Sequence, residues 1–378
     1  MRPIPPCSHR PPCPGCPRYG LSGIEASATE RLAALAARAG LELPRTAVGA
    51  PLGFRTRARL AVRGRAASPK VGIFQTDTHK IADIPRCGIH HPLVNEVAAE
   101  LRAAVRAAGV EPYADRPHRG VLRYLQVAVE RASGRAQVVL VGNCESPAAL
   151  APVFAALERV LGERLQGLFW NGNSERGNAI LGDAWEQIAG DEALRETVGG
   201  VEVFHPPGAF GQSHPELFES LALAARAAVP DGARVLELYA GTGAIGLGLL
   251  GRAASVALNE MAPHGLRGLE LGIAARPESE RARASILPGD AAQHAVRTAE
   301  ADAVIADPPR RGLDRAVRDA LLAAPPATFV YVSCGLDSFL GDAAALLDSG
   351  RFALRSLASY ALFPSTPHVE TLAVFARR

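Results

Sequence analysis

A cysteine at the end of a predicted strand is the first residue of this sequence that could do covalent chemistry. In the stretch FVYVSCGLDSF (residues 329–339), apolar and β-branched residues run directly into Ser333, Cys334 and Gly335. The apolar run predicts a buried strand that stops at the glycine. Cys334 is therefore either a small core residue or a thiolate nucleophile at the rim of a pocket.

A glycine-rich turn that precedes this cysteine in the chain could bind a nucleotide. In YAGTGAIG, Gly241, Gly243 and Gly246 follow a predicted strand and open a predicted helix, and Glu260 ends the next strand. Glycines let the backbone approach a ligand, and the acidic residue can accept from ribose hydroxyls. NAD enzymes and S-adenosylmethionine (SAM) methyltransferases share this pattern, and a tight turn without a ligand also fits it.

An Asp-Pro-Pro motif distinguishes between these cofactors. Asp307 in IADPPRRGLD (305–314) follows a predicted strand, at the edge where doubly wound sheets bind ligands. The two prolines make a rigid turn without backbone donors, which is typical of methyltransferases that act on bases and which a dehydrogenase does not need. Arg310 stands where amino-group methyltransferases usually have an aromatic residue, so adenine-amino chemistry is disfavoured.

Two different arrangements of elements must position these residues. The first half predicts a mixed α+β domain with helices at 22–40, 92–108 and 147–161 and strands at 53–65, 71–75 and within 121–141. From about residue 230, strands and helices alternate, which predicts a parallel, doubly wound α/β sheet. We therefore expect two domains, an α+β domain over residues 1–205 and a catalytic domain over residues 206–378.

The first predicted domain carries an excess of positive charge. Residues 1–90 contain 14 Arg or Lys against 5 Asp or Glu, although the net charge of the whole chain is only +3. In the predicted strand at 53–65, all five arginines fall on odd positions, so period two places them on one face. This face could contact RNA phosphates, or it could be a solvated face in an arginine-rich chain.

Five motifs, in order, resemble those of one enzyme family. FGQSHPE, ELYAGTG, DPPRRGLD, YVSCGLDSF and FPSTPHVETLAVF are similar to segments of the RNA (uracil-5-)-methyltransferases, which make 5-methyluridine in bacterial ribosomal RNA and tRNA. The resemblance covers about the last 180 residues. It implies a class I SAM-methyltransferase fold, a Rossmann-like sheet whose last strand is antiparallel, with SAM as cofactor and RNA as partner.

The resemblance also implies roles for individual residues. Cys334 would add to uracil C6 as a thiolate so that C5 can attack the methyl group of SAM, and Glu370 would then remove the C5 proton. An antiparallel last strand begins where the parallel strands end, so Glu370, Asp307 and Cys334 can border one pocket. Contacts with SAM or the uracil edge are implied for Gln212, Tyr239, Glu260 and Asp307, and Asp290 could also reach the adenine. Gly241 and Gly243 of the glycine-rich turn complete the predicted cofactor site.

Three residues depart from the family pattern: His214, Gly335 and Ala244. They leave open a non-catalytic RNA-binding protein that keeps the fold, whereas intact Cys334 and Glu370 favour an enzyme. The chain starts close to its first cysteine motif, which predicts that it lacks the extra N-terminal domain of some relatives. This favours 23S rRNA as the substrate, with tRNA as the alternative.

A second group of cysteines consists of Cys7, Cys13, Cys16 and, far downstream, Cys87. Four thiolates suit a [4Fe–4S] cluster or a structural zinc ion, and the spacing alone favours neither. The resemblance implies the iron–sulfur cluster, because the ribosomal-RNA members of the family carry four such cysteines. Cys144 belongs to no group and is interpreted as a structural residue.

The sequence also bears on localisation. The N-terminal residues MRPIPPCSHRPPCPGC lack the apolar segment of a secretory signal, and no apolar run reaches the roughly 18 residues of a membrane-spanning helix. We therefore expect a cytoplasmic protein that does not associate with membranes. No motif indicates an obligate protein partner.

Overall fold

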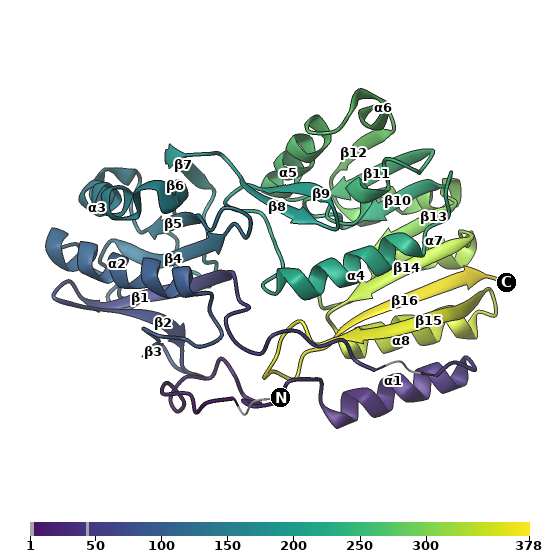
Figure 1. Cartoon of the computed structure of the whole chain (residues 1–378), viewed down its shortest axis with the longest axis horizontal. Coiled ribbons are helices and arrows are strands. Elements are labelled where there is room, and N and C mark those ends of the chain that lie inside the picture. The colour runs from purple at the N-terminus through teal and green to yellow at the C-terminus, as the bar shows by residue number, and fades with distance from the viewer. Residues whose placement is uncertain (1–3, 43–44) are drawn as a thin grey trace. The chain divides into compact units, whose positions relative to one another are not determined.

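The computed structural model describes residues 4–42 and 45–378, and the chain forms two compact units (Figure 1). Unit 1 contains Met1–Pro17 and Ala50–Glu196, and unit 2 contains Arg18–Gly49 and Thr197–Arg378. This division differs from the predicted domains 1–205 and 206–378, because an early segment packs in the later unit. Ala47 forms a parallel bridge with Tyr360, and Leu32 lies in an apolar core of unit 2.

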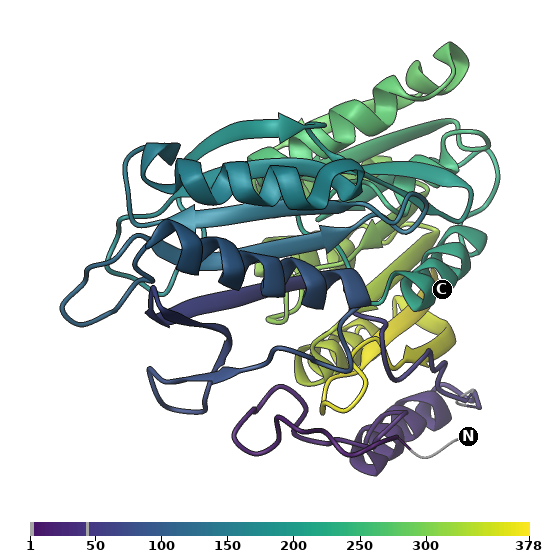
Figure 2. The same cartoon turned by 60° about the vertical axis from the view of Figure 1, so that its left-hand side comes forward.

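Unit 1 is built on a seven-stranded sheet in the order β3-β2-β1-β4-β5-β6-β7. Its strands are β1 (Arg57–Arg65), β2 (Ser68–Phe74), β3 (Ile81–Asp83), β4 (Leu122–Val129), β5 (Ala136–Gly142), β6 (Leu165–Gly172) and β7 (Ala184–Gly190). Its helices are α2 (Pro92–Ala108), α3 (Ala151–Leu161) and the short 3₁₀ helices η1 (Pro147–Leu150) and η2 (Gly162–Arg164). Helices α2 and α3 lie along the same face of the sheet, where they bury apolar side chains of β1, β4 and β5 (Figures 1 and 2).

Helix α2 has the bounds that the sequence predicts. Pro92 occupies its first turn, where the missing N–H costs nothing. The ring of His91 accepts a hydrogen bond from the backbone N–H of Leu93 at 3.2 Å. Gly109 ends the helix with a φ of 64°, a left-handed conformation that favours glycine.

The arginines of β1 do not form one solvated face. Arg63 is buried, and its guanidinium carbon lies 5.1–5.4 Å from the centroids of three aromatic rings, those of Phe74, Tyr113 and Tyr124. Burial also lowers the pKa of Arg57 to about 10. The predicted alternation along the strand is present, but aromatic side chains cover part of its charged face. The hypothesis of a continuous phosphate-binding strand face is therefore wrong for Arg63.

Unit 2 contains the predicted doubly wound α/β sheet, in the order β12-β11-β10-β13-β14-β16-β15. Its strands are β10 (Arg234–Leu238), β11 (Ser255–Glu260), β12 (Ala284–Pro288), β13 (Ala303–Ala306), β14 (Thr328–Ser333), β15 (Phe352–Tyr360) and β16 (Glu370–Arg377). Strands β10 to β14 are parallel, whereas β16 is antiparallel to β14, as the resemblance implies. The chain returns to unit 2 at Thr197, within a separate hairpin of β8 (Leu194–Val198) and β9 (Val201–His205).

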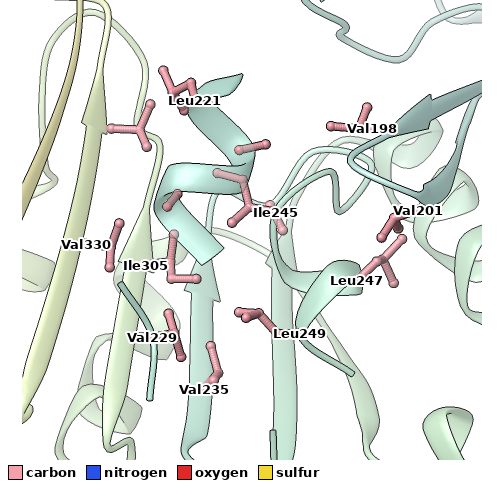
Figure 3. Packing of buried hydrophobic residues seen from close by; sticks show 14 of the residues in the cluster. Val198, Val201, Leu221, Val229, Val235, Ile245, Leu247, Leu249, Ile305 and Val330 are labelled. Carbon is pink, nitrogen blue, oxygen red and sulfur yellow. The ribbon is translucent and has the colours of Figure 1, made fainter. Parts of the chain in front are cut away.

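Helices cover both faces of this sheet, and each face has its own apolar core. The helical elements are α1 (Ala26–Arg38), α4 (Pro215–Ala227), α5 (Pro263–Ala274), α6 (Glu278–Arg281), α7 (Arg315–Ala323), α8 (Leu336–Asp348), and the 3₁₀ helices η3 (Gly246–Leu249) and η4 (Ala291–Glu300). One core packs Leu221 and Leu247 against Val235, Ile305 and Val330 (Figure 3). The other packs α1, α7 and α8 against the opposite face. No helix in the described ranges is long and apolar enough to cross a membrane.

Candidate active site

The ends of β10, β13 and β14 and the start of β16 meet at one edge of the sheet of unit 2. The register aligns Leu238 with Ala306, Ala306 with Tyr331, and Ser333 with Thr371. Tyr239, Asp307 and Cys334 follow these parallel strands, and Glu370 begins the antiparallel one. The structure therefore brings the predicted catalytic residues and Asp307 to the same sheet edge.

Cys334 is half-buried and borders a cavity of about 300 Å³. Burial, followed by the negative charges of Glu370 and Asp307, raises the pKa of its thiol to about 11. Arg310 opposes this shift through its positive charge and a hydrogen bond to the thiol. The thiolate is thus a minor species in the free protein at neutral pH, and a cationic ligand beside it would increase its population.

Glu370 and Asp307 form a pair of carboxyl groups with raised pKa values. Glu370 is 1% exposed, and neither of its oxygens has a hydrogen-bond partner among the described residues. Burial and the charge of Asp307 raise the pKa of Glu370 well above its ordinary value, and burial raises that of Asp307 to about 7. A buried polar group without a partner is costly, so this carboxyl is suited to a partner that a ligand supplies.

The glycine-rich turn lies next to Asp307 at this sheet edge. Tyr239 and Gly241 have positive φ values of 60° and 58°, which turn the chain sharply away from β10. A side chain at Gly243 would lie 2.7 Å from Leu269, so only glycine fits there. The turn leads into the short 3₁₀ helix η3 and not into the predicted α-helix.

Glu260 is held by backbone donors. Its carboxylate accepts from the N–H groups of Gly241 at 2.8 Å, Met261 at 2.9 Å and Ala262 at 2.7 Å. Oε1 accepts from both Met261 and Ala262, whereas Oε2 accepts only from Gly241 and keeps acceptor capacity for a further donor such as a ribose hydroxyl. Asp290 accepts from Ala292 N at 2.8 Å and thereby caps η4.

Tyr239 links the glycine-rich turn to the Asp-Pro-Pro loop. Its hydroxyl donates to the carboxylate of Asp314 at 2.9 Å, and that carboxylate also pairs with Arg311 at 2.8 Å. Burial raises the pKa of Tyr239, so its phenol stays protonated. Two of the predicted cofactor-binding segments are therefore tied together by a direct hydrogen bond.

Sequence reasoning missed two residues behind the glycine-rich turn. The buried guanidinium of Arg226 donates to four backbone carbonyls at 2.6–3.2 Å, those of Val198, Gly199, Ala244 and Ile245. The carboxyl of Glu237 accepts from Gly246 N at 2.8 Å, and burial raises its pKa to about 8. The single acidic residue inside the apolar strand ending in ELY was the available signal for Glu237. For Arg226 no signal existed, because helix α4 is otherwise an ordinary amphipathic helix.

The three departures from the family pattern have local surroundings that suit them. A side chain at Gly335 would lie 2.3 Å from the carbonyl oxygen of Arg310. His214 is buried against Gly49, where a side chain would lie 2.1 Å from the imidazole. Ala244 offers its carbonyl to Arg226. Gln212 lies partly exposed in the loop before α4, and its cofactor contact stays a prediction.

The four cysteines of the second group lie in one region of unit 1, and each is partly buried. Burial, and then the negative charges of Cys87, Cys13 and Cys7, raise the pKa of the Cys16 thiol to about 11. Residues 4–42 and 45–378 nevertheless contain no group of three His, Cys, Asp or Glu side chains arranged to hold a metal ion. The thiols are near one another, and their role as ligands stays a prediction.

Comparison with known proteins identifies relatives over most of the chain. No protein-family model matches it. An uncharacterized RNA methyltransferase of Protochlamydia amoebophila is 33% identical over 337 residues, which cover 87% of each chain. Another, from Geobacter sulfurreducens, is 29% identical over 337 residues, covering 86% of this chain and 66% of the relative.

A solved structure has the same fold. The tRNA (uracil-54, C5)-methyltransferase of Pyrococcus abyssi, in complex with S-adenosyl-L-homocysteine, superposes with a TM-score of 0.78 at 22% identity. The superposition covers 97% of this chain and 86% of the Pyrococcus chain. Together with the identity to the Protochlamydia protein, this confirms what the motifs predict: the chain belongs to the RNA methyltransferase family.

Proposed function

We propose that this protein is a SAM-dependent RNA (uracil-5-)-methyltransferase that makes 5-methyluridine. The observation that carries the proposal is the pairing of Ser333 with Thr371, which sets Cys334 and Glu370 at adjacent strand ends. A thiol and a buried carboxyl that has no hydrogen-bond partner in the described part of the chain provide a nucleophile and a base for one substrate. The motif resemblance and the fold of the Pyrococcus enzyme support the same reaction.

In the proposed reaction, the Cys334 thiolate bonds to uracil C6 and turns C5 into an enolate carbon that can accept a methyl group. When bound, SAM would supply the electrophilic methyl group, and breaking of its S–CH3 bond would leave neutral S-adenosyl-L-homocysteine. After the new carbon–carbon bond forms, Glu370 takes the proton from C5, and the electron pair of that C–H bond expels the Cys334 sulfur from C6. Arg310 stabilises the thiolate and so offsets part of the rise in the pKa of the Cys334 thiol. The target uridine must leave its base stack to reach this edge.

The residues at the sheet edge fit SAM. Glu260 keeps acceptor capacity for ribose hydroxyls, and a side chain at Gly241 would project into open space, which the glycine leaves free for a ligand. The remaining residues proposed to hold the cofactor are Gln212, Tyr239, Gly243, Asp290 and Asp307. Raised pKa values of Asp307 and Glu370 fit a site where a cation is expected to bind beside them.

For the substrate, we propose 23S rRNA, with tRNA as the alternative. The motifs most resemble those of the short ribosomal-RNA members of the family. The Pyrococcus neighbour acts on uracil-54 of tRNA and favours the alternative. Unmodified transcripts of both RNAs, analysed for 5-methyluridine by nucleoside mass spectrometry, distinguish the two.

Trapping with 5-fluorouridine tests the reaction itself. Fluorine at C5 cannot leave as a proton, so the protein, SAM and a 5-fluorouridine transcript should give a stable methylated adduct on Cys334. Cys334→Ser should give no adduct, and Cys144→Ser, the matched control, should behave like the wild type. With ordinary uridine, Glu370→Gln should accumulate the adduct that the wild type resolves. Binding of SAM without any adduct would instead indicate a non-catalytic RNA-binding protein.

We also propose that Cys7, Cys13, Cys16 and Cys87 ligate a [4Fe–4S] cluster, with zinc as the alternative. Four thiols that share a half-buried region have the donor chemistry of either group. Purification without oxygen should yield four irons and four sulfides per chain. Cys16→Ser should lose the metal and Cys144→Ser should keep it. Stoichiometric zinc, or no metal at all, contradicts the cluster.

A further inference from the structure

The cavity beside Cys334 extends to a helix that the proposed reaction does not use. It is bordered on one side by α1, through Arg31 and the neighbouring Ser27 and Glu25, and on the other by Arg310 and the start of α8. Helix α1 comes from the segment 18–49, far from the catalytic motifs in the sequence. Packing of Leu32 and Leu35 in the core of unit 2 fixes the helix in this place.

The lining of the cavity contains both hydrogen-bond donors and acceptors. Arg31 donates to Asp337 at 2.6 Å, and the two side chains remain 47% and 90% exposed. Most of their hydrogen-bonding capacity is therefore available to a ligand. Glu25 adds a second carboxylate, which pairs with Arg18. The pKa of His368 is lowered, mainly by burial, so its imidazole is neutral at physiological pH.

This mixture is better suited to the edge of a nucleobase than to a phosphate group. A phosphate needs only donors, and the carboxylates of Asp337 and Glu25 would repel it. A base edge presents both donors and acceptors, which arginine and carboxylate side chains can match. A volume of about 300 Å³ lies at the small end of ligand sites and suits a single base.

The position of the cavity indicates which base it takes. A ligand in the cavity lies against Cys334. In the proposed function, on which this inference rests, Cys334 is the group that bonds to the target uracil. Glu370, which must reach C5 of that uracil, does not line the cavity, so the cavity lies beside the position of the target base and a base in it belongs to an adjoining nucleotide. We propose that the cavity binds the base of a nucleotide next to the target uridine, with Arg31 as a donor to it and Asp337 as the residue that orients Arg31. Helix α1 is then part of the RNA-binding site of unit 2.

Removal of the neighbouring base tests this assignment. The probe is a hairpin RNA with one uridine in its loop, made intact and with an abasic ribose at the 5′ or the 3′ neighbour. Arg31→Ala should weaken binding of the intact hairpin, and lower kcat/KM for its methylation, about tenfold. On one of the two abasic hairpins, Arg31→Ala and the wild type should have the same affinity and the same kcat/KM. Arg315→Ala removes an exposed arginine on α7 that pairs with Asp319, outside the cavity, and should change neither value more than twofold.

Three outcomes overturn the assignment: no effect of Arg31→Ala on the intact hairpin, an equal loss on all three hairpins, or a matching loss for Arg315→Ala. An equal loss would place Arg31 on the target base or on the RNA backbone. Unchanged melting temperatures of the variants exclude unfolding as the cause. Asp337→Asn provides a second variant, which should lose less affinity than Arg31→Ala and show the same dependence on the neighbouring base. If the wild type makes no 5-methyluridine, the proposed function fails, and the binding measurements still decide the role of the cavity.

Discussion

At the scale of single residues, the site depends on ionisable groups whose pKa values are moved by burial. The pKa values of Cys334 and Glu370 are both raised, mainly by burial, and the charge of Glu370 contributes to the shift at Cys334. The free protein therefore holds a nucleophile and a base that are largely inactive until cationic and polar groups of the ligands arrive. Arg310 is the protein's own cation beside them.

The pH dependence of the Cys334 thiol follows from its pKa of about 11. Alkylation by iodoacetamide, followed by mass spectrometry of the intact protein, should speed up about tenfold per pH unit from pH 7 to 10, without a plateau. Arg310 lowers this pKa, so Arg310→Ala should slow alkylation at every pH in the range. A plateau near pH 8 would show that the thiol is not shifted upward.

The buried carboxyl of Glu370 should lower the stability of the fold. Its folded-state pKa is raised, so the folded state holds this proton more tightly than the unfolded state does. The free energy of unfolding is therefore highest below the unfolded pKa and falls as the pH rises through the folded value. Glu370→Gln should therefore increase the free energy of unfolding by about 1–3 kcal/mol at pH 8. The increase should shrink toward pH 5. Urea unfolding at pH 8 and at pH 5 measures the free energy of unfolding at both pH values. Glu278→Gln, on the exposed part of α6, should change neither.

At the scale of elements, one buried arginine ties three segments together behind the glycine-rich turn. Arg226 of α4 bonds the hairpin turn at Val198 and Gly199 and the carbonyls of Ala244 and Ile245. The turn has no α-helix after it to hold it, since η3 is a single short 3₁₀ helix. Its shape therefore depends on this side chain.

Loss of the Arg226 guanidinium should disorder the turn and weaken cofactor binding. Arg226→Met keeps much of the apolar stem and leaves four carbonyls without their donor, so the dissociation constant for SAM should rise about tenfold or more. The control variant Arg297→Met removes an exposed arginine of η4. Calorimetric titration with SAM measures both. Equal affinities in the two variants would show that the turn does not depend on Arg226.

At the scale of the whole molecule, the chain contributes an early segment to its later unit. Residues 18–49 supply α1 and a bridge at Ala47, and the buried side chains of α1 share a core with Phe329, Phe352 and Phe375. The stability of unit 2 therefore depends on residues that precede most of unit 1 in the sequence.

Truncation of a buried residue in α1 should destabilise unit 2. Leu32 is fully buried, so Leu32→Ala should lower the free energy of unfolding by about 2–5 kcal/mol. Leu223→Ala, at a residue of α4 that is 48% exposed, should cost much less. Both tryptophans, Trp170 and Trp185, lie in unit 1, so their fluorescence does not report on unit 2, and hydrogen exchange of β14 and β16 is the measurement. Unchanged exchange in Leu32→Ala would contradict the role of α1.

Much of the site could be predicted from the sequence, because its residues belong to short motifs at strand ends. Asp307 and Cys334 directly follow apolar runs, so their place at the carboxyl edge of a parallel sheet follows from local pattern and the βαβ rule. The bounds of α2 were equally local, since proline and glycine mark its two ends. The burial of Arg63 was not, because the aromatic rings around it come from three separate segments.

The pattern along the chain was enough to predict the parallel sheet and the nucleophile candidate, and the resemblance of the motifs indicated the base candidate and the family. The sheet and the nucleophile follow from period, glycine and proline positions, and residue order, which are local properties of the chain. Tertiary packing was needed to place α1 beside the cavity of Cys334, to bring Arg226 behind the glycine-rich turn, and to leave Glu370 without a hydrogen-bond partner among the described residues. Each of these features depends on which distant segments pack together, and the order of residues along the chain does not show which segment packs against which.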